Sequence, residues 1–401
     1  MLDSKKRHST VTPARRRQTI FRVLAPLLSV AILLGVLELC ARLYLTVFGL
    51  PRTPYDYRKK QPAPYKNASY FSREFILESF KQPGGWQFPK GTRLIIPNDY
   101  AGRYFNVRDG IRVTAFQPGN FENTVYLFGG STVYGSEVPD HLTIASQLQL
   151  LFKTHHGNRF IVRNYGTTTV TVTQQLERLK TLLLQPGDIV IFYDGVNDVY
   201  QGLFYASPEE TMIERNRRAV SEMGAVRRGL LALHRGAARL SSLVTLCCDP
   251  TNRNLPSHFS DPALIDELVA SLELRYKKTI EASAAYTAKS QAKFYHFLQP
   301  QLFASEMFTA YEEQLLQNHH VVPKGTKEAF QKGYPALKAA IRELAETIRS
   351  HDLSGVLNRR PGNREYYLDV CHVNHEANRI IADAVIEHVR KDLELPGTDR
   401  R

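Results

Sequence analysis

The sequence has few cysteines and none of the spacings that mark metal or redox sites. Only Cys40, Cys247, Cys248 and Cys371 occur, and no two of them form a CxxC pair. Neither a zinc ribbon nor a thioredoxin-type redox centre is therefore indicated. In an oxidising compartment Cys247 or Cys248 could bridge to Cys371. Connectivity is not encoded in the spacing, and free thiols are the simpler interpretation.

Internal repeats are also missing, as is any basic stripe interleaved with aromatic residues beyond the first segment of the chain. The formal net charge is +13, but residues 1–22 hold seven basic side chains against one acid, so this segment supplies about half of the excess. Nucleic-acid binding would need such a stripe on a folded face. We therefore expect no nucleic-acid partner, while 43% hydrophobic and 23% charged residues indicate an ordinary globular protein.

Charge is absent from residues 23–37, and apolar character continues to residue 50. A helix needs about 20 residues to cross a bilayer, so 23–50 predicts a transmembrane anchor. Glu38 and Arg42 stand at i,i+4 and can pair near one interface. No small-residue cleavage pattern follows cleanly, which favours an anchor over a cleaved signal peptide. The positive-inside rule then predicts a cytoplasmic tail and an extracytoplasmic domain.

The changes of composition and charge along the chain predict five segments. They are a basic cytoplasmic tail (1–22), a single membrane helix (23–50), a stalk and irregular lead-in (51–120), a folded domain (121–392) with a helical insertion (203–290), and a flexible tail (393–401). Short strands are expected within the lead-in, near 92–96 and 110–113.

Short apolar runs alternate with amphipathic stretches in the folded domain. The runs predict strands at 124–128, 160–162, 189–193 and 293–298, and the stretches predict helices at 142–153, 173–184, 335–348 and 378–389. Because the strand runs are continuously apolar rather than alternating, they are typical of a parallel sheet covered on both faces.

Polar residues follow these strands at the points where functional groups gather in open α/β sheets. Ser131 follows the first strand, Gly166 the second and Asn197 the third, while Asp369 and His372 precede the last helix. A serine needs a base to become a nucleophile, and a carboxylate can orient that base. The Ser131 and Gly166 N–H groups and the Asn197 amide can stabilise an oxyanion. The set indicates acyl transfer.

Four blocks in this order, G-G-S-T-V-Y-G, N-Y-G, G-V-N-D and D-V-C-H, resemble those of the SGNH (GDSL-type) hydrolases, in a membrane-anchored bacterial branch with a GGS block. The resemblance covers roughly residues 122–390 and implies a flavodoxin-like three-layer α/β/α fold. It implies Ser131 as nucleophile, His372 as base with Asp369 as its partner, and Gly166 and Asn197 as oxyanion donors. Gly130 replaces the usual Asp, and a Thr-Thr-Thr run after Gly166 replaces the usual small residues, which bears on the shape of the acyl pocket.

The spacing of Asp369, Cys371, His372 and His375 does not favour a metal site, and we expect no metal and no cofactor. His375 is expected in the first turn of the last helix. The prediction is a membrane-anchored serine esterase acting on O-acyl esters of a cell-surface glycan or lipid. An O-acyltransferase with the same triad, and a catalytically silent scaffold in envelope polysaccharide assembly, remain the alternatives. Acyl-chain length, oligomeric state and protein partners are not encoded in the motifs.

Overall fold

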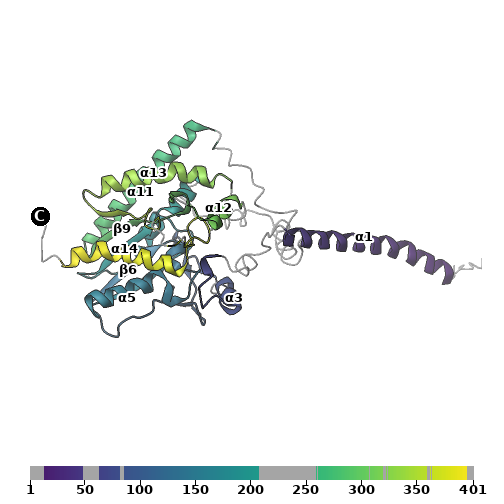
Figure 1. Cartoon of the computed structure of the whole chain (residues 1–401), viewed down its shortest axis with the longest axis horizontal. Coiled ribbons are helices and arrows are strands. Elements are labelled where there is room, and N and C mark those ends of the chain that lie inside the picture. Colours follow the sequence, from purple (N-terminus) through teal and green to yellow (C-terminus); the bar gives the residue numbers. More distant parts are fainter. Residues whose placement is uncertain are drawn as a thin grey trace, which may run out of the picture. The chain divides into compact units, whose positions relative to one another are not determined.

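The computed structural model describes residues 13–47, 63–81, 85–206, 259, 261–306, 308–318, 322, 324–358, 362 and 364–394. The chain divides into two units, and helix α1 (Pro13–Val47) is the described part of the first unit. All other described elements belong to the second unit (Figure 1).

Helix α1 contains one segment, Leu24–Leu43, that is long and apolar enough to cross a membrane, with a mean hydropathy of 2.3 over its most apolar window. The side chains of this segment are almost all exposed. Its length and composition fit a membrane span and a signal sequence equally. Arg42 Nε donates to Glu38 Oε1 at 2.9 Å, which confirms the expected i,i+4 pair.

Five parallel strands form the centre of the second unit. They are β6 (Asn123–Gly129), β7 (Phe160–Gly166), β8 (Ile189–Asp194), β9 (Lys293–Leu298) and β10 (Arg349–Asp352), in the order β10-β9-β8-β6-β7. Numbered along the chain, this is the flavodoxin-like order 2-1-3-4-5. The continuously apolar runs are thus strands buried on both faces, and every residue of β8 is buried. The predicted fold class is confirmed.

The sheet continues beyond β7 through three short antiparallel strands, β5 (Ile111–Arg112), β4 (Asn106–Arg108) and β3 (Tyr100–Ala101). A separate hairpin pairs β1 (Trp86–Gln87) with β2 (Ile96–Pro97). The short strands expected near 92–96 and 110–113 correspond to β2 and β5. The lead-in is nevertheless not irregular throughout, because β3 to β5 join the main sheet and Arg112 is wholly buried there. Strands of two or three residues are too short for a periodic pattern to show which sheet they join.

Helices cover both faces of the sheet (Figure 1). One face carries α5 (Ile144–His156) and α14 (His375–Glu394), and the other carries α6 (Val172–Leu179), α11 (Pro262–Ala288) and α13 (Thr326–Leu344). The shorter helices are α3 (Arg73–Lys81), α4 (Ser131–Tyr134), α7 (Val196–Val199) and α12 (Ala310–Gln317), with 3-10 turns at Ala63–Tyr65, Asp140–Leu142 and Leu302–Ala304 and a π-helical turn at Tyr200–Phe204.

Two predicted helical segments need correction. Helix α11 is not part of an insertion, because it connects β8 to β9 and buries Leu272, Tyr276 and Ile280 in the main core. Residues 207–258 of the expected insertion lie outside the described residues. Helix α13 begins at Thr326 and contains Pro335 in its interior, where the sequence indicated a helix start.

Candidate active site

Ser131 begins helix α4, directly after the carboxyl end of β6, with Gly130 as the N-cap residue. A Cβ atom at Gly130 would lie 2.5 Å from Nδ2 of Asn197, which is closer than real contacts allow. A glycine at this position therefore lets the Asn197 amide approach the start of α4. The structure thus brings Ser131 and Asn197, two of the predicted site residues, to the same edge of the sheet.

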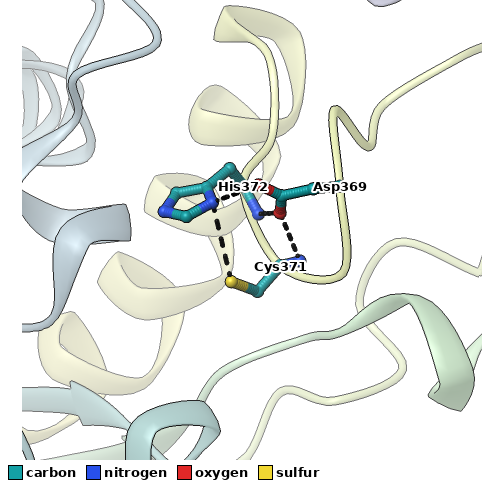
Figure 2. A group of neighbouring side chains, drawn as sticks. All are labelled: Asp369, Cys371 and His372. Carbon is teal, nitrogen blue, oxygen red and sulfur yellow. Dashed lines mark hydrogen bonds and ion pairs between the residues drawn. The ribbon is translucent and has the colours of Figure 1, made fainter. Parts of the chain in front are cut away.

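His372 lies between Ser131 and Asp369. Its Nε2 is 2.7 Å from Ser131 Oγ, and its Nδ1 is 2.6 Å from Asp369 Oδ2. Figure 2 shows the Asp369 carboxylate beside the imidazole ring. Both ring nitrogens thus have a partner, which is the arrangement needed for a base that removes the serine proton while a carboxylate fixes its tautomer.

The pKa values of the two groups shift in opposite directions. Burial alone lowers the pKa of His372, but the Asp369 carboxylate, with smaller contributions from Cys371 and Glu137, outweighs it and holds that pKa well above its usual value. Burial alone raises the pKa of Asp369, but His372 and two backbone N–H donors outweigh it and leave that pKa below its usual value. Each group therefore stabilises the charged form of the other, which is the carboxylate of Asp369 and the imidazolium of His372.

The loop that carries His372 is held by the Asp369 carboxylate within it and by a contact with the turn at Ala63–Tyr65. Asp369 Oδ1 accepts the backbone N–H groups of Cys371 at 2.9 Å and His372 at 2.8 Å. Two residues beyond the histidine, Asn374 Nδ2 donates to the carbonyl of Pro64 at 2.9 Å. The 3-10 turn at Ala63–Tyr65 thus helps to position the candidate base, a role that no motif in the sequence indicates.

Asn197 lies in helix α7, and its Nδ2 donates to the carbonyl of Val170 at 2.9 Å. The acids that flank Asn197 make structural hydrogen bonds. Asp198 Oδ1 accepts the N–H of Val172 at 3.2 Å, and Asp194 Oδ1 accepts the Tyr276 hydroxyl at 2.6 Å. Burial, together with the nearby Asp194, raises the pKa of Asp198 to about 8.

Gly166 ends β7, and close packing against α4 explains why this position is a glycine. A Cβ atom there would lie 2.2 Å from the backbone nitrogen of Tyr134 in α4. Its own N–H donates to Asn164 Oδ1 at 2.9 Å, and Gly166 is not among the residues that line the cavity at Ser131. Its role as an oxyanion donor stays a prediction, which the geometry does not favour.

A cavity of about 390 Å³ opens beside the triad, with Ser131, Asn197, Asp369 and His372 in its wall. The Thr-Thr-Thr run after Gly166, which the sequence linked to the shape of the pocket, contributes Thr168 and Thr169 to this wall. Sequence reasoning missed other wall residues, among them Glu137, Tyr200, Gln201 and Tyr205. Thr169 has a positive φ of 61°, which is uncommon outside glycine. Glu137 stands six residues after Ser131, outside every recognised block.

Asp369, Cys371 and His372 bring one potential metal ligand each to within 4.8 Å of one another (Figure 2). The separation of 2.6 Å between Asp369 Oδ2 and His372 Nδ1 is that of a hydrogen bond rather than of two metal ligands. Cys371 is a buried free thiol whose Sγ is 3.8 Å from His372 Nδ1. His375 is the first residue of α14, as predicted, and faces Tyr70.

Comparisons with known proteins give weak likenesses. No protein-family model and no curated protein match the chain. Similar solved structures include an α/β hydrolase enzyme from the metagenome of Lake Arreo in Spain, with 13% identity over 69% of this chain and 97% of that one and a TM-score of 0.37. A lipolytic G-D-S-L protein from Veillonella parvula has 13% identity over 66% and 96% of the two chains and a TM-score of 0.36.

An acetylxylan esterase from Geobacillus stearothermophilus has 12% identity over 67% of this chain and 95% of that one, with a TM-score of 0.36. Identities and TM-scores this low do not assign an activity to the chain. The candidate site therefore stands on its own geometry.

Proposed function

We propose that this chain is a serine-dependent ester hydrolase of the SGNH type. One observation carries the proposal, namely that Ser131, His372 and Asp369 form a continuous hydrogen-bonded series at the carboxyl edge of the sheet, beside a cavity. A silent scaffold has no physical need for this alignment. A silent scaffold would have been favoured if Ser131 and His372 lay too far apart to interact.

In the proposed reaction, Ser131 Oγ attacks the ester carbonyl while His372 Nε2 takes the hydroxyl proton. The new C–O bond forms as the carbonyl electrons move onto oxygen. The Ser131 N–H and the Asn197 amide stabilise that oxyanion. When the intermediate collapses, the alcohol leaves with the proton from His372. Water then attacks the acyl-enzyme by the same route, and a carboxylic acid is released.

The membrane helix and its basic flank extend the proposal to location. In this proposal α1 is a single span with the basic residues 1–22 in the cytoplasm, and the sheet domain lies on the extracytoplasmic side. The substrate would then be an O-acyl ester of a cell-surface glycan or lipid. Transfer of the acyl group to a second hydroxyl instead of water would use the same three residues.

The test is hydrolysis of short p-nitrophenyl esters by the full chain in detergent, with Ser131→Ala beside it. We expect the alanine variant to lose at least about a thousandfold in kcat/KM, because the nucleophile is gone. Ser290→Ala, at the turn after α11, is the matched control and should keep wild-type activity.

A fluorophosphonate should label the wild type and not Ser131→Ala. Labelling without hydrolysis would favour the acyltransferase. A folded wild type that shows neither labelling nor turnover would exclude the proposed chemistry.

A further inference from the structure

The segment 134–138, which follows the candidate nucleophile, has its backbone held by side chains from earlier in the chain. All five of its carbonyl groups accept a side-chain donor, and the donors are Tyr65, Ser79 and Arg112. Residues 135–138 lie in no helix or strand, so no regular ladder of hydrogen bonds fixes their position. The three side chains therefore decide where this segment lies.

Two of the donors come from residues 63–81, which include the first 3-10 turn and helix α3 and are named here the bridging segment. The Tyr65 hydroxyl donates to the carbonyl of Glu137 at 2.8 Å, and Ser79 Oγ donates to the carbonyl of Ser136 at 2.9 Å. Both donor side chains are buried, Tyr65 wholly. Because Ser136 and Glu137 line the cavity beside the triad, the bridging segment supports one side of that cavity.

The bridging segment also contacts the loop that carries the candidate base. Tyr65 lies in one apolar cluster with Leu368, which precedes His372 in this loop. On the other side of the histidine, Asn374 Nδ2 donates to the carbonyl of Pro64 at 2.9 Å. Adjacent residues of the bridging segment thus contact the loop on both sides of His372.

The alignment of Ser131 with His372 depends on two segments that are 241 positions apart in the chain. The loop 364–374 belongs to no helix, and its internal bonds, such as Leu368 N–H to the His372 carbonyl at 2.8 Å, fix its shape but not its distance from α4. A misplacement of about 1 Å can lower a reaction rate about a hundredfold. A side chain that contacts both segments acts directly on that distance.

We propose that the bridging segment aligns the candidate nucleophile with the candidate base, and that Tyr65 is its central positioning residue. The Tyr65 ring packs beside the loop of the base, and its hydroxyl holds the segment that follows α4. The inference rests on the proposed ester hydrolysis and adds to it a residue outside all four motif blocks. Tyr65 takes no part in the bond-making steps at Ser131.

The experiment uses Tyr65→Phe in the full chain in detergent, a change that removes the hydroxyl and keeps the ring. A small fluorophosphonate is added, and labelling is followed with time. The final extent counts the folded sites, while the rate constant measures how well Ser131 is activated. We expect full labelling with a rate constant about tenfold lower, because the serine and its base lose part of their alignment. A change of stability alone would lower the extent or the melting temperature and leave the rate constant unchanged.

Tyr295→Phe is the matched control. Tyr295 is also wholly buried, and its hydroxyl donates to Asp392 Oδ2 at 3.1 Å. It is not among the described residues that line the cavity. The control should lose stability and keep the wild-type rate constant. An unchanged rate constant in Tyr65→Phe, or an equal fall in both variants, overturns the inference.

Ser79→Ala decides the question if Tyr65→Phe does not fold. It removes the bond from helix α3 to the carbonyl of Ser136 and leaves the aromatic packing in place. We expect the rate constant of labelling to fall while the final extent stays complete. A wild-type rate constant in this variant would contradict a positioning role for the bridging segment.

Failure of the proposed function is separately visible. If the wild type is neither labelled nor active, or if Ser131→Ala is labelled equally, the hydrolase proposal fails. The alignment is then decided by amide hydrogen exchange in peptides that cover 131–138 and 364–374. Faster exchange in both regions of Tyr65→Phe, and not in Tyr295→Phe, supports the bridge between them. Exchange that stays at the wild-type rate in either region overturns it.

Discussion

At the scale of the residue, the ionisation of His372 decides when the candidate nucleophile can be activated. Only a neutral imidazole accepts the proton of Ser131, while Asp369 favours the charged form and holds the pKa of His372 well above its usual value. The kcat/KM of the wild type should therefore rise with pH through a point above about 6.5, the ordinary pKa of histidine.

Asp369→Asn should move that point to lower pH, because the main group that raises the pKa of His372 is removed while burial still lowers it. The rate on the plateau should fall by about 10³ to 10⁴, since an amide favours the wrong tautomer of the imidazole. Profiles of kcat/KM against pH for both proteins check this. An acid limb that stays in place would show that Asp369 does not control the base.

At the scale of the element, the antiparallel edge of the sheet supports helix α4 through one buried cation. Arg112 in β5 is wholly buried, and its guanidinium bonds Asp140 and the backbone carbonyls of Tyr134, Gly135 and Val138. These carbonyls belong to the end of α4 and the segment after it. The edge strands thus hold the turn that carries Ser131.

Arg112→Met should lower the free energy of unfolding by about 3–5 kcal/mol, because it removes the cationic partner of the Asp140 carboxylate and a donor to each of three backbone carbonyls. Chemical denaturation followed by circular dichroism measures the loss. Arg103→Met is the matched control, because its ion pair with Glu74 is largely exposed and should contribute no more than about 1 kcal/mol. Equal losses in the two variants would contradict a supporting role for Arg112.

At the scale of the whole molecule, the charge of the first segment predicts how the chain sits in a membrane. In bacterial cells that express the chain with a tag at each end, protease added outside spheroplasts should remove the C-terminal tag and leave the N-terminal tag protected. Replacing the basic residues of 1–22 by glutamine should weaken this orientation. Loss of the N-terminal tag from the mature protein would indicate a cleaved signal sequence instead.

Much of the parallel sheet was predictable from the sequence because its signal is local. Each buried strand is a continuous apolar run, and Lys293–Leu298 was predicted with the bounds that β9 has. Ser131, Gly166 and Asn197 were predicted to lie at one edge because each follows a strand, and the carboxyl ends of parallel strands meet at one edge. Asp369 and His372 precede the last helix, and they were assigned to the same site by the chemistry of the set and by the resemblance of the four blocks.

The sequence by itself therefore predicted the fold class, the membrane-competent helix and the candidate residues for acyl transfer. Only the tertiary structure decided that strands β3 to β5 complete the sheet, that α11 belongs to the core, and that Gly166 packs against α4. It also placed Glu137 in the cavity wall. These features depend on contacts between segments distant in the chain, and such contacts leave no periodic trace in the sequence, because packing selects shape and charge at single positions.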